Sequence, residues 1–310
     1  MKLALYTDSI GGQSFDRVLE IAVEAGVEAL ELATGGQSAA PHLDLERFLA
    51  DANARRRLLG KLESHDLELC ALNCSAWPLH PVVGEKSRRL IEDTFSLAEL
   101  LEVSTIVTMS GTPGDVPEST TFTWPWYPWP EDQVALLERQ REATLVLWEE
   151  LAAKAVSHGV SRVAFELHPL HLVYNVPTLE RLREAVGPAI GANVDPSHLV
   201  WQRMDPAAVV TSLGAAVQHV HLKDTRYDER ELGLAGLLDA RPFADPAKRA
   251  WTFCTPGRGG TVDWPAFLRA LSDVGYDGPV SIENEDPFVG EVEGVLEAAR
   301  FVRPLLQTPA

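Results

Sequence analysis

The stretch VAFELHP, residues 163–169, is an apolar run that ends on a glutamate, a histidine and a proline. The run predicts a buried strand. Glu166 and His168 are two residues apart, so their side chains would point to the same face of that strand. A carboxylate and an imidazole that share one face of a buried strand need partners, which other parts of the chain must supply.

Short apolar runs of the same kind alternate with helix-like segments along the whole chain. The predicted strands are Leu3–Asp8, Ala29–Thr34, Glu68–Cys74, Thr105–Gly111, Arg162–Pro169, Ile190–Asp195, Val217–Asp224 and Pro279–Glu285. The predicted helices are Phe15–Ala25, Leu45–His65, Glu85–Leu101, Glu131–His158, Thr178–Val186, Pro206–Leu213, Trp264–Val274 and Val289–Leu306. This alternation predicts an α/β fold with a parallel sheet, and eight βα units favour a closed (β/α)8 TIM barrel over a doubly wound open sheet. No linker interrupts the pattern, so we expect one TIM barrel domain over residues 1–310.

Two long segments interrupt the alternation. Residues 111–130, GTPGDVPESTTFTWPWYPWP, follow the fourth strand, and residues 225–260 follow the seventh. In a barrel both would be βα loops on the face that carries active sites, and loops of this length usually have a function. The first segment suits an aromatic lid in which Trp126 binds a sugar or a planar aglycone, and it equally suits a loop attached to the barrel rim.

The composition is that of an acidic globular protein. The 310 residues are 45% hydrophobic and 23% charged, and 27 lysines and arginines against 45 aspartates and glutamates give a net charge of −18. This acidity argues against nucleic acids and anionic membranes as partners, but not against metal cations or neutral sugars. No apolar stretch reaches the length of a membrane span, and the N-terminus does not predict a signal peptide.

The cysteines indicate a reducing compartment. Cys70, Cys74 and Cys254 are odd in number and lack the spacing of a zinc site, so we expect a cytoplasmic protein without structural disulfides. A catalytic thiol is disfavoured because neither Cys70 nor Cys74 has an evident activating partner.

Polar side chains follow four successive strands at the point where each strand ends. Glu166 ends the fifth strand, Asp195 the sixth, His221 the seventh and Glu283 the eighth. The separation of Glu166 from Asp195 and that of Asp195 from His221 each match the length of one βα repeat. The separation of His221 from Glu283 matches one repeat plus the long loop after the seventh strand. Neighbouring strands of a barrel can therefore bring the four side chains to one point.

Buried carboxylates gathered in this way need a compensating cation. Three carboxylates and one imidazole suit Mn²⁺ first, then Mg²⁺ or Co²⁺, with Zn²⁺ also compatible and sulfur-loving ions disfavoured. The alternative is a network of ion pairs with nearby lysines and arginines.

The ordered pieces FELHP, NVDPSHLVWQ, HVHLKD, PGRGGTVDW and GPVSIENED resemble the xylose isomerase-like TIM barrel superfamily of sugar-phosphate isomerases and epimerases, which also includes endonuclease IV-type enzymes. The segment ALNCSAWPLHP resembles the sugar-enzyme branch, and the likeness covers essentially the whole chain. The resemblance implies one divalent metal held by Glu166, Asp195, His221 and Glu283. It also implies that the two glutamates act as an acid and base pair on opposite faces of a keto sugar. The acidity and the single ligand set disfavour the endonuclease branch, which uses a larger histidine-rich site.

The chemistry itself accounts for such an arrangement. Removing a proton next to a carbonyl creates an enediolate, which a bound metal stabilises while one carboxylate takes the proton and a second returns it. His198 would contact a substrate hydroxyl or act as a further ligand. Arg258, in PGRGG, would bind substrate oxygens or lie in a surface turn, and Lys223 would bind substrate or pair with a ligand carboxylate. His219 shares a face with His221 and would support it.

These residues support a metal-dependent isomerase or epimerase of a keto sugar or keto-glycoside. The alternative is a lyase that cleaves 3-oxo-glycosides by β-elimination, with His168 serving the leaving group. The lyase resembles the catalytic subunit of C-glycoside deglycosidases, which pairs with a small β-sandwich subunit; otherwise we expect a homo-oligomer. A metal-free sugar-binding module or scaffold subunit is a third interpretation, which the intact ligand set at four strand ends disfavours.

Overall fold

The computed structural model describes residues 1–307, and its central feature is a closed barrel of eight strands. Their order around the barrel is β1-β10-β7-β6-β5-β4-β3-β2. The strands are β1 (Lys2–Tyr6), β2 (Ala29–Gly36), β3 (Glu68–Ser75), β4 (Thr105–Thr108), β5 (Arg162–Glu166), β6 (Ile190–Val194), β7 (Val217–Leu222) and β10 (Pro279–Ile282). The fold is therefore the predicted (β/α)8 TIM barrel, and the open sheet is excluded.

The chain divides into two compact units. The first unit consists of Met1–Glu31, Lys61–Leu69 and the chain from Val194 onward, and the second consists of Leu32–Gly60 and Cys70–Asn193.

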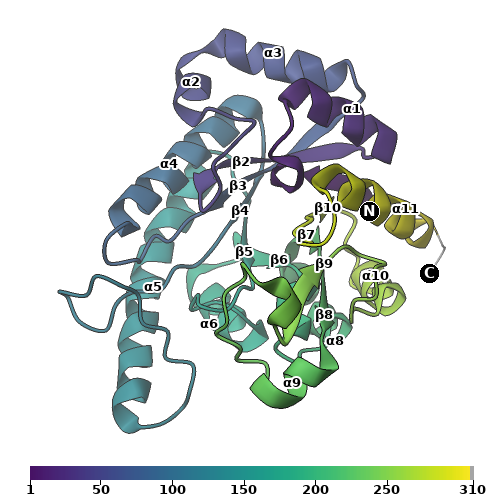
Figure 1. Ribbon diagram of the computed structural model, residues 1–310. Coiled ribbons are helices and arrows are strands. Elements are labelled where there is room, and N and C mark those ends of the chain that lie inside the picture. The colour runs from purple at the N-terminus through teal and green to yellow at the C-terminus, as the bar shows by residue number, and fades with distance from the viewer. Residues whose placement is uncertain (308–310) are drawn as a thin grey trace. The chain divides into compact units, whose positions relative to one another are not determined.

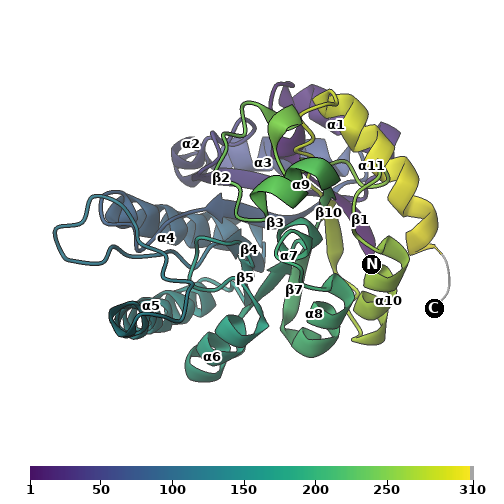
Figure 2. The ribbon, with the colours of Figure 1, turned by 60° about the horizontal axis from the view of Figure 1, so that its bottom comes forward.

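In the first unit, parallel pairing of β1 with β10 and of β10 with β7 sets the register of the strand ends. Ser281 lies opposite His221, and Tyr6 on β1 lies opposite Glu31 on β2. The helices of this unit include α1 (Phe15–Ala25), α7 (Pro196–Val200), α8 (Pro206–Leu213), α10 (Trp264–Asp273) and α11 (Glu291–Leu306), with 3-10 turns at Thr7–Ile10 and Gly214–Ala216. Figure 1 shows α1 packed beside α11, and Figure 2 shows α8 beside α10.

In the second unit, β3, β4, β5 and β6 pair in parallel, with Thr108 opposite Phe165 and Glu166 opposite Asn193. Its helices include α2 (Leu45–Ala50), α4 (Gly84–Leu101), α5 (Glu131–Ser157) and α6 (Val176–Val186), and the last three lie side by side (Figure 2). The predicted helix Leu45–His65 is two helices, α2 and α3 (Ala52–Glu63), because Asp51 adopts an extended backbone between them.

Several helices begin and end at the residues that the sequence offers for capping. The Ser14 side chain accepts a hydrogen bond from the backbone N–H of Arg17 at the start of α1, and Gly26 ends that helix in the left-handed region. Asp263 caps α10 with Pro265 in its first turn. These local signals explain why the boundaries of α1 and α10 were predictable from the sequence to within one residue.

The segment after β7 is more ordered than the predicted loop. It contains β8 (Asp224–Tyr227), α9 (Glu229–Ala235), a 3-10 turn at Pro246–Lys248 and β9 (Trp251–Cys254), and β8 pairs antiparallel with β9 (Figure 1). The buried carboxylate of Asp224 accepts hydrogen bonds from the backbone N–H groups of Thr261 and Val262 and from the Trp264 indole. A Cβ at position 260 would lie 2.0 Å from the Asp224 carboxyl carbon, so Gly260 permits this closure.

The helices of residues 1–307 include none that is both long enough and apolar enough to span a membrane.

The buried Trp148 gives a test of the packing in the second unit. Its side chain is fully buried, its indole N–H donates to the carbonyl of Ser110 at 2.9 Å, and its ring meets that of Phe165 edge-on at 4.4 Å. We expect Trp148→Ala to lower the free energy of unfolding by about 3–5 kcal/mol, measured by guanidinium unfolding. Trp129→Ala is the control, because Trp129 is 70% exposed and its loss should change stability by less than about 0.5 kcal/mol. Equal unfolding midpoints for the two variants would contradict this packing.

Two of the cysteines should be inert in the folded protein. Burial raises the pKa of Cys74 to about 11 and that of Cys254 to about 12, so both thiols stay protonated at pH 8. Iodoacetamide at pH 8 should therefore modify neither residue in the native protein, whereas the unfolded protein should be modified at all three cysteines. Rapid modification of native Cys254, detected by peptide mass spectrometry, would contradict the burial of this thiol.

Candidate metal centre

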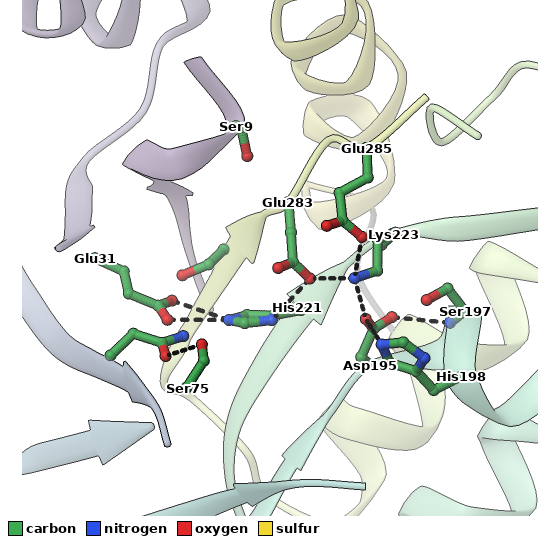
Figure 3. A network of polar contacts seen from close by, with 12 residues as sticks. Ser9, Glu31, Ser75, Asp195, Ser197, His198, His221, Lys223, Glu283 and Glu285 are labelled. Carbon is green, nitrogen blue, oxygen red and sulfur yellow. Dashed lines mark hydrogen bonds and ion pairs between the residues drawn. The ribbon is translucent and has the colours of Figure 1, made fainter. Parts of the chain in front are cut away.

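In the first unit, a group of ionisable side chains gathers at the carboxyl ends of β7 and β10 (Figure 3). His221 belongs to β7 and lies opposite Ser281, so Glu283 follows directly beyond the end of the neighbouring strand. Asp195 comes immediately after β6 and begins α7, where its carboxylate accepts a hydrogen bond from the backbone N–H of Ser197 at 2.9 Å. Parallel strands place these ends at one edge of the sheet.

Three of the four predicted ligands belong to the first unit. Asp195, His221 and Glu283 each offer one donor atom, and these atoms lie within 4.8 Å of one another. His221 is fully buried, Asp195 is 1% exposed and Glu283 is 9% exposed.

Lys223 lies among the carboxylates of this group. Its ammonium nitrogen is 2.6 Å from Glu283 Oε2, 2.9 Å from Glu285 Oε2 and 3.1 Å from Asp195 Oδ2 (Figure 3). Lys223 therefore pairs with the carboxylates of two predicted ligands, Asp195 and Glu283, and its contact with substrate stays a prediction. The neighbouring ring of Phe253 on β9 lies 4.8 Å from the ammonium group.

The imidazole of His221 lies between two carboxylates. Its Nδ1 is 3.1 Å from Glu283 Oε2, and its Nε2 is 3.1 and 3.2 Å from the two oxygens of Glu31 (Figure 3). Burial by itself lowers the pKa of His221, but the charges of Glu31 and Glu283 outweigh burial and hold that pKa well above its usual value. The electrostatic potential at this site is therefore negative and favours a bound positive charge.

The pKa values of the two carboxylates beside His221 shift in the opposite direction, below their usual range. Burial by itself raises the pKa of Glu283, but Lys223 and His221 outweigh it and hold that pKa below the usual range. The pKa of Glu31 is likewise well below its usual value, because His221 and His219 outweigh its complete burial. Both groups are therefore carboxylates at neutral pH.

Glu31 was not predicted as a site residue. It lies on β2 within the apolar run ALELA, and its side chain is fully buried. His219 Nε2 lies 2.7 Å from Glu31 Oε2 and 3.1 Å from Ser281 Oγ. A single carboxylate inside an otherwise apolar strand was the only signal in the sequence that could have identified Glu31.

The donor set fits a divalent cation. The acidic cluster of this unit consists of Glu31, Asp195, Glu283 and Glu285. Four carboxylates face one lysine, so this cluster has an excess of negative charge unless the three neighbouring imidazoles of His198, His219 and His221 are all protonated. The ion-pair network that was the alternative interpretation is thus present but does not neutralise the cluster without that protonation. Carboxylate oxygens with one imidazole nitrogen suit Mn²⁺, Mg²⁺, Co²⁺ or Zn²⁺.

His198 lies at the edge of this group. Its Nε2 is 3.4 Å from Asp195 Oδ2, and its ring meets Phe253 edge-on at 5.3 Å. The hairpin that follows β7 therefore contributes an aromatic ring beside both His198 and Lys223. His198 as a substrate contact or further ligand stays a prediction.

Glu166 and His168 belong to the second unit. Glu166 is the last residue of β5 and is 5% exposed, and the His168 ring meets His171 edge-on at 5.7 Å. The place of Glu166 in the ligand set and the role of His168 stay predictions.

The aromatic segment after β4 has an exposed part and a packed part. Trp126 is 49% exposed and contacts Tyr127, whereas Trp124 meets Tyr174 edge-on at 5.1 Å. Phe122 packs on Trp77 at 4.7 Å, in an aromatic contact that was not predicted. Substrate binding by Trp126 stays a prediction.

Arg258 follows β9 in a glycine-rich turn. Its guanidinium pairs with Glu293 and Glu297, both on α11. These ion pairs account for the charge of Arg258, and its predicted contact with substrate oxygens stays a prediction.

Comparison with known proteins agrees with the fold. The family model described as xylose isomerase-like TIM barrel matches residues 19–305. The uncharacterized protein YfiH of Bacillus subtilis (strain 168) is 39% identical over 300 residues, which cover 95% of this chain and 96% of YfiH. Inosose dehydratase of Geobacillus kaustophilus (strain HTA426) is 28% identical over 150 residues, which cover 46% of this chain and 47% of that enzyme.

Three solved structures share the fold at low sequence identity. The probable 3-DHS dehydratase AsbF of Bacillus anthracis has a TM-score of 0.69 at 20% identity and covers 98% of this chain and 99% of its own. The IOLI protein with a bound zinc atom has a TM-score of 0.70 at 17% identity, with coverage of 99% and 98%. An L-ribulose 3-epimerase has a TM-score of 0.66 at 14% identity, with coverage of 99% and 94%. Because the family match spans nearly the whole sequence, the chain belongs to the xylose isomerase-like TIM barrel family.

Proposed function

We propose that this protein is a divalent-metal-dependent isomerase or epimerase that removes a proton from the carbon next to the carbonyl of a keto sugar or keto-glycoside. The observation that carries the proposal is the convergence of Asp195, His221 and Glu283 in a buried group that is rich in carboxylates. A likeness in fold to an L-ribulose 3-epimerase supports it.

The metal would be held by Asp195, His221 and Glu283, with Glu166 as the proposed fourth ligand. When bound, a divalent cation supplies a Lewis acid for the oxygens at the reacting carbons. We take Mn²⁺ as the first candidate, and the zinc in the IOLI structure makes Zn²⁺ the second metal to test.

Glu283 is the residue that we assign to accept the proton from carbon. Its carboxylate is ionised at neutral pH, and Lys223 orients it by donating a hydrogen bond to Oε2 at 2.6 Å. Epimerisation also needs a group that returns a proton to the opposite face, and isomerisation needs one that returns it to the neighbouring carbon. Glu166 is the residue that we assign to this step.

A lyase that starts with the same proton transfer is the second candidate. Inosose dehydratase, a relative over part of the chain, and the probable 3-DHS dehydratase carry names of enzymes that eliminate water. Elimination needs an acid for the leaving group, and His168 at the end of β5 is the candidate. The leaving group can be water or, as in C-glycoside deglycosidases, the aglycone of a 3-oxo-glycoside.

Metal binding should depend on Glu283 far more than on its neighbour Glu285. We expect Mn²⁺ titration by calorimetry to give one site per chain, and Glu283→Gln to weaken it by about 100-fold or more because a ligand oxygen and a buried charge are lost. Glu285→Gln is the matched control, since it removes one charge from the same cluster but no predicted ligand, and should weaken binding severalfold at most. Failure of the wild-type protein to take up Mn²⁺ or Zn²⁺ would refute the proposed metal site.

Proton transfer can be followed without knowing the natural substrate. We expect NMR of the Mn²⁺- or Zn²⁺-supplied protein with a panel of ketoses, inososes and 3-oxo-glycosides in D₂O to show deuterium entering next to the carbonyl. An epimer or aldose product supports the isomerase, whereas loss of water or of an aglycone supports the lyase.

His168→Gln separates the two candidates. Under the lyase, this variant should lose elimination by at least about 100-fold while deuterium exchange continues, because only the leaving group loses its acid. Under the isomerase, no elimination product forms in either protein. Absence of deuterium exchange across the whole panel would count against both candidates.

A further inference from the structure

Glu31 and His219 form a fully buried pair behind His221. The exposed fraction of all three side chains is zero, and all three belong to the first unit. The Nε2 atom of His219 lies 2.7 Å from Glu31 Oε2. The Nε2 atom of His221 lies 3.1 and 3.2 Å from the two oxygens of the same carboxylate (Figure 3). Complete burial of a carboxylate is costly, so a group of this kind needs a role or a strong set of partners.

The geometry around His221 distinguishes its two ring nitrogens. Nε2 lies against Glu31, whereas Nδ1 lies 3.1 Å from Glu283, on the side of the ring where Asp195 also lies (Figure 3). A histidine can bind a metal through one nitrogen only if that nitrogen carries a lone pair, and the proton then lies on the other. If a metal takes the place of the proton on Nδ1, the hydrogen bond to Glu31 keeps the remaining proton on Nε2 and leaves the lone pair of Nδ1 for the metal.

Two further contacts restrict the ring and its carboxylate partner. The Tyr6 ring lies parallel to that of His221, with centroids 5.6 Å apart and an interplanar angle of 12°, so the imidazole plane is held. His219 contacts Oε2 of Glu31 and meets His221 edge-on at 5.5 Å, and Ser281 Oγ lies 3.1 Å from the same His219 nitrogen. His219 therefore restrains the carboxylate that in turn orients His221.

We propose that Glu31 is a positioning residue for the metal centre, which fixes the orientation and the protonated nitrogen of His221, and that His219 holds Glu31 in place. This inference rests on the proposed function, because it assumes that a divalent cation binds at Asp195, His221 and Glu283. It adds Glu31, which acts on the metal only through His221, and it assigns the expected support by His219 to its contact with Glu31.

The same three side chains could instead be ligands of a second cation. The distances favour hydrogen bonds, because 2.7–3.2 Å is the usual separation of an imidazole nitrogen and a carboxylate oxygen that share a proton. A second cation would also require His221 to lose both ring protons and bridge two metals. The proposal therefore predicts one metal per chain.

The test uses the full chain labelled with ¹⁵N at histidine and loaded with Zn²⁺, which is diamagnetic. Long-range ¹H–¹⁵N correlation spectra should show His221 with its proton on Nε2 and the metal on Nδ1, and metal analysis should give one zinc per chain. A wild-type spectrum with the proton on Nδ1 of His221 overturns the proposal without recourse to any variant.

Variants then measure the effect of Glu31. Glu31→Gln keeps the size of the side chain but removes the charge and one acceptor oxygen, and it should weaken Zn²⁺ and Mn²⁺ binding about 10–100-fold in calorimetric titrations. Ser281→Ala is the matched control, because it removes the other contact of His219 Nε2 and leaves Glu31 intact, so its metal affinity should stay within about threefold of wild type. Circular dichroism of each variant checks that it is folded.

The outcomes separate this inference from the proposed function. Metal uptake by wild type with unchanged affinity in folded Glu31→Gln overturns the role of Glu31 alone. Two metals per wild-type chain, with one lost in Glu31→Gln, would make Glu31 a ligand and also overturn it. No metal uptake by wild type would overturn both the inference and the proposed function.

Discussion

The interaction on which the first unit depends is the placement of His221 between two buried carboxylates. Glu31 on one side and Glu283 on the other raise the pKa of the imidazole, and Lys223 joins the same group through Glu283. Desolvating this much negative charge is unfavourable unless cations are close, so the site is built to attract positive charge. A divalent metal is the ion that best matches its oxygen and nitrogen donors.

The barrel makes this cluster possible because the pairing of neighbouring strands fixes which residues lie side by side at the strand ends. Parallel pairing of β7 with β10 sets His221 opposite Ser281, and the residues just beyond these strands turn into loops where their side chains converge. Nearby segments close the edge of the cluster. The hairpin of β8 and β9 places Phe253 beside Lys223 and His198, and the carboxylate of Asp224 holds the end of that hairpin through backbone hydrogen bonds.

The sequence predicted the parts of this arrangement that leave a local pattern. Apolar runs predicted all eight barrel strands, and polar residues at strand ends led to Asp195, His221 and Glu283. Glu31 was missed because its contacts with His219 and His221 span 188 and 190 positions of sequence, and a single glutamate in a strand gives no indication of them. The hairpin was missed because β8 and β9 are only four residues each, and Arg258 could not be placed because its partners lie on α11.

A crystal structure of the protein soaked with Mn²⁺, with data collected at the manganese edge, tests the central claim most directly. The account predicts one strong anomalous peak per chain, within bonding distance of Asp195, His221 Nδ1 and Glu283, with His221 Nε2 still against Glu31. The account would be contradicted if saturating Mn²⁺ gave no peak at this position and the ammonium group of Lys223 were the only cation found among the carboxylates.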